Sequence, residues 1–468
     1  MKYSIKGLTI IVGMLAVTCI NLLHCQTIIK PGNISGIWTK KTSPYIIKGD
    51  INIPAGKALI ITPGVVVRFD GPYLLNVQGS LMARGTEKDS IVFTVTDTTG
   101  IKSKKRYGWN GIHFDRRPIT WDTTYFRMPD DEMLRKLIMQ YIEEGKIDTM
   151  ARICISLTIN DAVNDATLAD SIFRGQQFSE LTFCHFEFGT AMGRKQPYVF
   201  GGAVYIYRYS NLLIQHCTFE NNFAYAGGAV YCKEAAPVLI RNHLRKCRAQ
   251  SSGGAMVFVH SEPILVNNLI SDNNADFNGG GILFYESYPC MVNNRVFRNQ
   301  AKNSGGGMFC EKKLENFLST KQYSMTTGTK FERNKTFENV ILKDFHINSS
   351  DHFNGQFQNN LICQNKALTG AGIGLCATNP ELVNMTIADN YADIIGGGIY
   401  SYHSAPKVIN SILYGNMKDQ VFLSGKGVPV FTYCNIEKDI AGIRTDTIFN
   451  PLFEYNNILN ASPDFCNP

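Results

Sequence analysis

Residues 201–206 read Gly-Gly-Ala-Val-Tyr-Ile, and close copies of this hexapeptide follow along the chain. The copies begin at Gly227, Gly253, Gly279 and Gly305, so that a constant 26-residue step separates them. Two later copies, at Gly370 and Gly396, are one such step apart. A fixed period of this length is typical of solenoid proteins, in which each repeat packs only against its neighbours.

Two positions in every copy are apolar and lie two residues apart. They are Val204, Val230, Met256, Ile282 and Met308, followed by Ile206, Cys232, Phe258, Phe284 and Cys310. Residues two apart in a strand share one face, so this face is expected to point into the core. A second short apolar run follows each aligned proline, as at Pro237, and a third run carries residues such as Leu244. The sequence therefore predicts an all-β parallel β-helix with three strands per coil and a 26-residue period.

The corners between these strands are expected to hold glycine and asparagine, because both tolerate left-handed backbone angles. Asn242, Asn268 and Asn294 keep the 26-residue step. We expect their side chains to hydrogen-bond from coil to coil and to cap corner backbone groups that would otherwise be unpaired.

The period divides the chain into seven predicted segments. They are a signal peptide (1–25), an N-terminal cap with the first coils (26–117), a partly helical insertion (118–179), regular coils (180–313), an insertion or irregular coil (314–356), further coils (357–435) and a C-terminal cap (436–468). The 65-residue gap between Gly305 and Gly370 fits one coil plus 39 residues or two coils plus 13, and both alternatives stay open.

Residues 1–25 are typical of a secretory signal, because Lys2 and Lys6 precede an apolar run from Gly7 to Leu23. Cleavage after Cys25 is expected, and a lipid anchor on Cys25 is the alternative. No later run reaches about 18 uninterrupted apolar residues, so no transmembrane span is expected after signal removal. We expect an exported protein, located outside the cell, on its surface or in the periplasm.

Charge and cysteine content exclude some functions. Removal of the two signal lysines lowers the formal net charge from +7 to +5, which gives no concentrated basic surface for nucleic acid. The eleven remaining cysteines form no CxxC pair and no zinc-ligand spacing. We expect most of them to be small buried apolar side chains.

Several stretches carry a resemblance to a known family. They are Gly49–Gly56, Leu81–Thr86, Gly108–Ile112 and the ending Asn450–Phe453. In these stretches the chain resembles the right-handed parallel β-helix (pectin-lyase-like) proteins exported by bacteria, especially those of Bacteroidetes type. The resemblance covers most of residues 45–468 and implies a right-handed solenoid. It implies little about function, since this fold hosts lyases, hydrolases and binding proteins.

A weaker likeness is to the chlamydial polymorphic outer-membrane proteins, which repeat a Gly-Gly-Ala-aliphatic motif together with Phe-x-x-Asn. Residues 201–204 match the first motif and residues 219–222 match the second. Those relatives are adhesin-like, and this likeness implies an adhesive surface as one alternative.

A column of titratable residues occurs seven positions after each first glycine. It consists of Arg208, Glu234, His260, Glu286 and Lys312, and later His403. The preceding column consists of Tyr207, Lys233, Val259, Tyr285, Glu311 and Tyr402. Arg116 aligns with the first column, and both insertions leave the solenoid beside it. We therefore hypothesise a groove that is walled by the insertions and floored by this column.

The residues of this groove fall into two sets of candidates. The catalytic candidates are Glu234, His260, Glu286 and Arg208, and the substrate-binding candidates are Tyr207, Lys233, Tyr285, Lys312, Tyr402 and His403. Glu234 and Glu286 are two coils apart, about 9.6 Å, which approaches the separation of the carboxylates in inverting glycosidases. His260 lies between these two acids, and a raised pKa is expected for it.

No cofactor or metal is predicted, and Ca²⁺, which lyases of the family use, finds no acidic cluster to hold it. The leading interpretation is a protein that binds a polysaccharide or surface glycan. The alternatives are a polysaccharide lyase or glycoside hydrolase that acts in the groove, and an adhesin-like surface protein. The simplest explanation of the column is a row of solvated charges that compensate one another.

Overall fold

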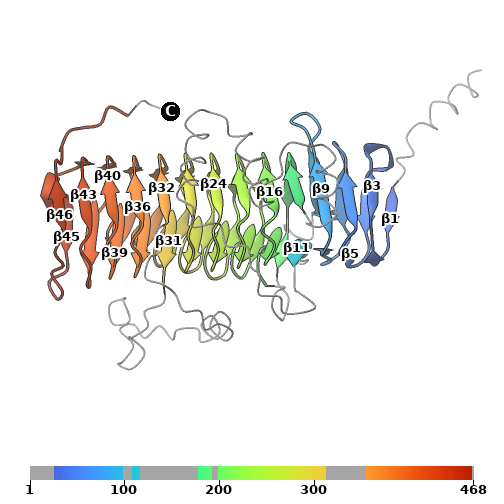
Figure 1. Cartoon of the computed structure of the whole chain (residues 1–468), viewed down its shortest axis with the longest axis horizontal. Coiled ribbons are helices and arrows are strands. Elements are labelled where there is room, and N and C mark those ends of the chain that lie inside the picture. The colour runs from blue at the N-terminus through green and yellow to red at the C-terminus, as the bar shows by residue number, and fades with distance from the viewer. Residues whose placement is uncertain (1–25, 99–107, 116–177, 192–198, 313–354, 466–468) are drawn as a thin grey trace, which may run out of the picture.

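A computed structural model of the chain describes residues 26–98, 108–115, 178–191, 199–312 and 355–465. In these residues the chain forms an elongated parallel β-helix with almost no helix (Figure 1). Three sheets of 13 strands each run along its length, and a fourth sheet has seven strands. The prediction of an all-β parallel solenoid is confirmed.

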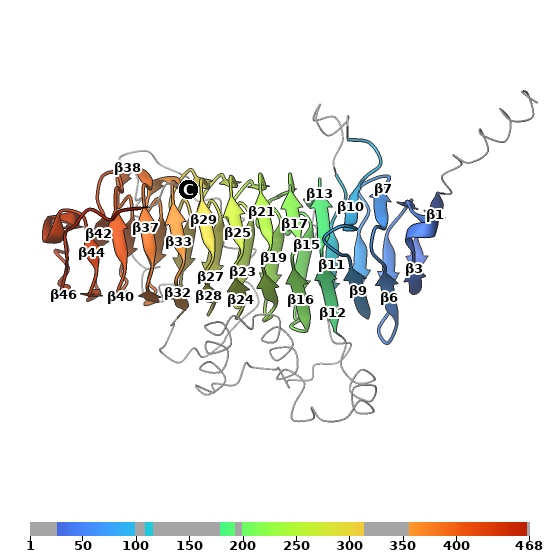
Figure 2. The same ribbon diagram turned by 90° about the horizontal axis from the view of Figure 1, so that it is seen from above.

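The strands of each sheet follow one another in chain order. Sheet A contains β1 (Thr27–Ile29), β4 (Tyr45–Ile47), β7 (Val66–Phe69), β10 (Ile91–Val95), β13 (Cys184–Glu187), β17 (Thr218–Glu220), β21 (His243–Arg245), β25 (Leu269–Ser271), β29 (Arg295–Phe297), β33 (Leu361–Cys363), β37 (Thr386–Ala388), β41 (Ile412–Tyr414) and β44 (Asn435–Ile436). Figure 2 shows β13 to β29 of this sheet side by side. Sheet B contains β2 (Gly32–Asn33), β5 (Ile51–Ile53), β8 (Leu75–Val77), β11 (Ile112–Asp115), β15 (Val204–Tyr207), β19 (Val230–Lys233), β23 (Met256–Val259), β27 (Ile282–Tyr285), β31 (Met308–Glu311), β35 (Ile373–Cys376), β39 (Ile399–Tyr402), β42 (Val421–Ser424) and β45 (Ile443–Thr445).

Sheets C and D complete the coil. Sheet C contains β3 (Gly36–Trp38), β6 (Ala58–Ile61), β9 (Ser80–Arg84), β12 (Ser179–Thr182), β16 (Leu212–Gln215), β20 (Val238–Ile240), β24 (Ile264–Val266), β28 (Cys290–Val292), β32 (Gln356–Gln358), β36 (Glu381–Val383), β40 (Lys407–Ile409), β43 (Val430–Thr432) and β46 (Glu454–Asn456). Sheet D contains β14 (Thr190–Ala191), β18 (Phe223–Ala224), β22 (Arg248–Ala249), β26 (Asn274–Ala275), β30 (Gln300–Ala301), β34 (Lys366–Thr369) and β38 (Tyr391–Ile395). Two short 3-10 turns, η2 (Lys40–Thr42) and η3 (Asp439–Gly442), lie near the ends. The expectation of three strands per coil is therefore wrong for these seven coils, which carry a fourth short strand.

The strand register reproduces the period of the sequence. Val204 pairs with Val230, and Val230 pairs with Met256, so neighbouring strands of sheet B are one period apart. Both predicted inward series are fully buried. The core also stacks aromatic rings between coils, as between Phe186 and Phe219, whose centroids are 4.7 Å apart. Each such side chain contributes roughly 1.5–3 kcal/mol by its burial.

The predicted asparagine ladder is present at the corner between sheets C and A. The Nδ2 of Asn242 donates to Oδ1 of Asn268 over 3.0 Å, and Asn268 donates to Asn294 over 3.0 Å. A second ladder, which we did not predict, runs after sheet A. It joins Asn273, Asn299, Asn365, Asn390 and Asn416.

Glycine and asparagine supply left-handed angles at many corners, as predicted, for example at Gly201 (φ 63°) and Asn267 (φ 55°), but charged residues adopt such angles as well. Arg241 (φ 52°) and Lys246 (φ 52°) adopt this conformation, and each directly precedes a buried residue of the next strand or ladder. The left-handed angle costs roughly 1–2 kcal/mol for such a residue. We attribute its tolerance to the hydrogen bonds that the neighbouring corner groups make between coils.

The pairing of β31 with β35 settles the alternative that the sequence left open. Met308 is the direct partner of Ile373, so the 65-residue gap holds one coil plus 39 residues. The predicted insertions, 118–179 and 314–356, lie almost wholly outside the described residues, as do the signal peptide and Arg116. The chain leaves the described part after Asp115 in one coil and after Lys312 in another, both at the end of a sheet B strand.

Six of the nine cysteines in the described part of the chain are buried in the apolar core. Their environment agrees with the expected role as small apolar side chains. Within the described residues, no helix is long and apolar enough to cross a membrane.

Candidate functional site

The predicted column lies at the corner between sheets B and C, one residue beyond each sheet B strand. Five of its members adopt left-handed angles, and the first four are Arg208 (φ 52°), Glu234 (φ 53°), His260 (φ 47°) and Glu286 (φ 44°). His403 (φ 50°) occupies the same position later, but Ala377 comes between. We call the uninterrupted part, Arg208 to Lys312, the corner row.

The charged members of the corner row are paired along the solenoid axis. The Nε of Arg208 lies 2.5 Å from Oε2 of Glu234, and Nζ of Lys233 lies 3.6 Å from the other oxygen of Glu234. The guanidinium of Arg208 also lies 5.0 Å from the ring centroid of Tyr207. The side chains of Arg208 and Glu234 are only 10% and 13% exposed, which makes this pair a largely buried cluster rather than a solvated edge.

His260 pairs with the next acid along the row. Its Nδ1 lies 3.2 Å from Oε2 of Glu286. Burial lowers the pKa of His260 below its ordinary value, although Glu286 and Glu234 oppose this effect. The expectation of a raised pKa is therefore wrong, because removal from water disfavours the imidazolium more than the two carboxylates favour it.

The aromatic candidates differ in their surroundings. Tyr285 is buried in an apolar cluster with Val257, Leu283 and Phe309 on the outer face of sheet B. Its ring is therefore not exposed for a sugar to stack on. Tyr207 is half-buried and stays beside the Arg208 cluster.

Tyr402 and His403 form a separate group further along the solenoid. Their ring centroids lie 4.3 Å apart, and Phe449 lies 5.6 Å from His403. The structure therefore brings together Arg208 with its neighbours and His260 with Glu286, and it keeps Tyr402 and His403 apart from them.

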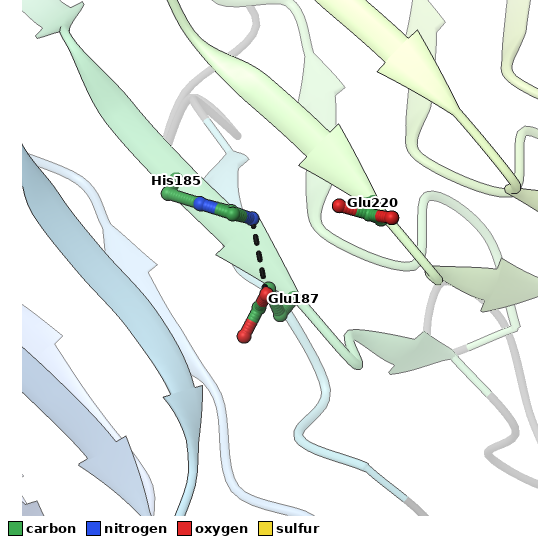
Figure 3. Close-up of side chains that lie close together, drawn as sticks. All are labelled: His185, Glu187 and Glu220. Atoms are coloured by element: carbon green, nitrogen blue, oxygen red, sulfur yellow. Dashed lines mark ion pairs between the residues drawn. The ribbon is translucent and has the colours of Figure 1, made fainter. Parts of the chain in front are cut away.

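A second cluster, which sequence reasoning missed, lies on the outer face of sheet A (Figure 3). Cys184 and Phe186 of β13 point into the core, so His185 and Glu187 between and after them point outward. Glu187 is the direct strand partner of Glu220 in β17. One ligand atom from each of these three side chains lies within 4.8 Å of the others.

The surroundings of this cluster include two cations. Oε2 of Glu220 accepts from Nη2 of Arg245 over 2.6 Å, and Oε1 accepts from Nζ of Lys246 over 3.0 Å. Burial acts to raise the pKa of Glu220, but the hydrogen bonds from Lys246 and Arg245 outweigh it and hold the pKa below its ordinary value. The basic segment 241–248 thus pairs in part with a buried acid.

Comparison with known proteins agrees with the architecture. The family model described as the right handed beta helix region matches residues 170–322 and 202–391. The matched residues span just under half of the chain, and they agree with the parallel β-helix that the structure shows. This confirms the resemblance to pectin-lyase-like proteins that the sequence motifs carried. No curated protein matches the chain.

Solved structures that match the chain include the following three. Two are mutants of the periplasmic alginate epimerase AlgG, each 12% identical over 93% of this chain and 85% of the other, with TM-scores of 0.38 and 0.35. The third is the Streptococcus pneumoniae surface protein and adhesin PfbA, which is 8% identical over 88% of this chain and 92% of the other, with a TM-score of 0.18. Similarity this low carries no argument about the activity of this chain.

Proposed function

We propose that this chain is an exported protein that binds a polysaccharide or surface glycan along the corner row. The observation that carries the proposal is the largely buried cluster of Arg208, Lys233 and Glu234 beside the ring of Tyr207. It combines fixed hydrogen-bonding groups with an aromatic side chain, which are the elements that orient a polar ligand on a protein surface.

The charge balance of the row bears on the class of glycan. The corner row and the column of residues that precede it contain three cations, which are Arg208, Lys233 and Lys312, and three carboxylates. The carboxylates are Glu234, Glu286 and Glu311. With His260 neutral at pH 7, these two columns together have no net formal charge. Long-range attraction of a polyanion to the corner row is therefore not favoured. The ligand class that fits best is a neutral or weakly charged glycan that is recognised by hydrogen bonds and ring contacts.

Titration calorimetry with neutral and acidic polysaccharides tests this proposal. Tyr207→Ala and Glu234→Gln are expected to weaken binding of the neutral ligand by about tenfold each, which corresponds to about 1.4 kcal/mol. Tyr433→Ala is the control, because Tyr433 is a tyrosine on another part of the solenoid and is 62% exposed. Equal loss in all three variants, or binding that requires an acidic polymer and disappears with salt, would contradict the proposal.

The pair of His260 and Glu286 favours one alternative, a polysaccharide lyase or glycoside hydrolase. A neutral imidazole with a carboxylate 3.2 Å away is a usable general base. Assays of unsaturated product and of new reducing ends, with His260→Ala as the control, separate the two functions. If the wild type forms product and His260→Ala does not, the protein is an enzyme and the proposed binding function is wrong. If the wild type binds the glycan and forms no product, the proposed binding function stands.

A further inference from the structure

We propose that His185, Glu187 and Glu220 form a binding site for a divalent metal ion of zinc-like preference. The site lies on the outer face of sheet A and is independent of the glycan proposed for the corner row. Figure 3 shows the three side chains close together on two adjacent strands, with the imidazole of His185 beside the carboxylate of Glu187.

The geometry of the three donors suits such an ion. Alternation along β13 places His185 and Glu187 on one face, and the register of β13 with β17 brings Glu220 directly beside Glu187. Nε2 of His185 lies 3.2 Å from Oε1 of Glu187. Two ligands of a tetrahedral zinc ion, with bonds of about 2.0–2.2 Å, are separated by about 3.3–3.6 Å. The observed separation is close to that value before any ion is bound.

A second observation points to a missing ligand. Nε2 of His185 is buried from solvent and has no hydrogen-bond partner in the part of the chain that the structure describes. It lies near a carboxylate oxygen without the alignment of a hydrogen bond. Buried polar atoms are nearly always hydrogen-bonded, and an imidazole nitrogen that faces two carboxylates without a hydrogen bond, on a side chain that is 30% exposed, is an arrangement that a metal ion would complete.

The donor types select the metal class. An imidazole nitrogen with two carboxylates suits zinc and similar transition metals, whereas calcium prefers six to eight oxygen ligands. Three protein ligands also leave at least one position for water or for another donor, as in zinc sites that are not purely structural.

The two cations at Glu220 oppose metal binding to different degrees. Arg245 and Lys246 each hold one oxygen of Glu220. The side chain of Lys246 is 58% exposed, and it can move into solvent when an ion takes its oxygen. We infer that Lys246 weakens metal affinity and that its removal strengthens it.

Calorimetric titration of the tag-free protein with Zn²⁺ near pH 7 tests the site, and Co²⁺ absorption reports the coordination. One ion per chain is expected. His185→Gln and Glu187→Gln should each weaken binding by at least about tenfold. Lys246→Met should tighten it by roughly three- to tenfold through the loss of one nearby positive charge.

Two matched variants guard against general effects. Lys302→Met removes another exposed lysine that pairs with an acid, Asp276, and His403→Gln removes a histidine far along the chain. Both should leave Zn²⁺ affinity unchanged. The proposal is overturned if Zn²⁺ does not bind, if it binds equally well to the His185 and Glu187 variants, or if Lys246→Met lowers affinity. Glycan binding at the corner row tests a different surface, so either proposal can fail alone.

Discussion

At the scale of single residues, the corner row shows how a charged side chain is kept in a left-handed corner. Glu234 adopts φ 53°, a left-handed angle that costs free energy for any residue other than glycine. In this conformation its carboxylate forms ion pairs with Arg208 and Lys233. Because the pair is only 10–13% exposed, removal of one partner leaves a poorly solvated charge and costs more stability than the loss of one partner of a surface ion pair.

We expect Arg208→Ala to destabilise the protein by about 1–3 kcal/mol, because it leaves the largely buried Glu234 carboxylate with a weaker partner. Urea unfolding of Arg208→Ala, Glu234→Gln and the double variant measures the coupling between the two side chains. A coupling near zero would show that the two residues do not act as a pair. Arg84→Ala is the exposed comparison, since Arg84 is 57% exposed beside Glu180, and its effect should be within about 1 kcal/mol.

The pH dependence of stability follows from the direction of the histidine shifts. Burial lowers the pKa of His260, and it lowers the pKa of His243 in the same way. The unfolded chain therefore binds protons at higher pH than the native chain, so stability is present above about pH 6.5 and declines as the pH falls below it. The lowered pKa of Glu220 acts in the same direction over a lower pH range, because the stability that this carboxylate contributes is lost only as the pH falls through the more acidic carboxylate range.

The measurement is thermal unfolding of the wild type and of His260→Gln across this range. The variant should show a smaller decline between pH 7 and pH 5 than the wild type. An unchanged decline in the variant would contradict a lowered pKa for His260.

At the scale of elements, the asparagine ladder joins neighbouring coils through buried side-chain hydrogen bonds. Asn268 is 1% exposed and donates to the carbonyl of Leu239 and to Asn294. Its own Oδ1 accepts from the backbone and the side chain of Asn242. We expect Asn268→Ala to cost about 2–4 kcal/mol, because two buried backbone groups lose their partners.

Hydrogen exchange at neighbouring amides, together with urea unfolding, checks this value. Asn52→Ala is the control, since Asn52 lies on the outer side of β5 and makes partly exposed side-chain hydrogen bonds, and it should cost less than about 1 kcal/mol. Equal costs in both variants would show that the ladder has no special role.

The elements also show why sequence reasoning located the corner row but not the cluster of His185, Glu187 and Glu220. The inward series, the ladder from Asn242 and the corner row all keep the 26-residue step, so alignment of the copies places them. His185 pairs with Thr218, and Glu187 pairs with Glu220, across a longer step than this period. A search at constant period cannot bring these residues together.

The direction of the His260 shift was missed for a different reason. The neighbouring charges can be read from the aligned copies, but the loss of water around the ring depends on the side chains that cover it. The same holds for Tyr285, which packs against Leu283 and Phe309 instead of presenting an open ring.

At the scale of the whole molecule, the solenoid holds the corner row at a constant rise of about 4.8 Å per coil. From Arg208 to Lys312 there are four such steps, which gives a row about 19 Å long. Each coil packs on its neighbours, so the spacing is set by the sheets and not by the ligand. A linear glycan bound along this row should therefore gain contacts with each added unit until it spans the row.

We expect affinity to rise with oligosaccharide length and to become constant once the ligand is longer than about 19 Å. Calorimetry with a series of oligosaccharides of one glycan measures this dependence, and Lys312→Ala should shorten the length at which affinity stops rising. The reason is that loss of Lys312, the last residue of the corner row, removes contacts only for ligands long enough to reach it. If a single sugar unit bound as tightly as the polymer, recognition would occur in one small pocket, and an extended binding edge would be ruled out.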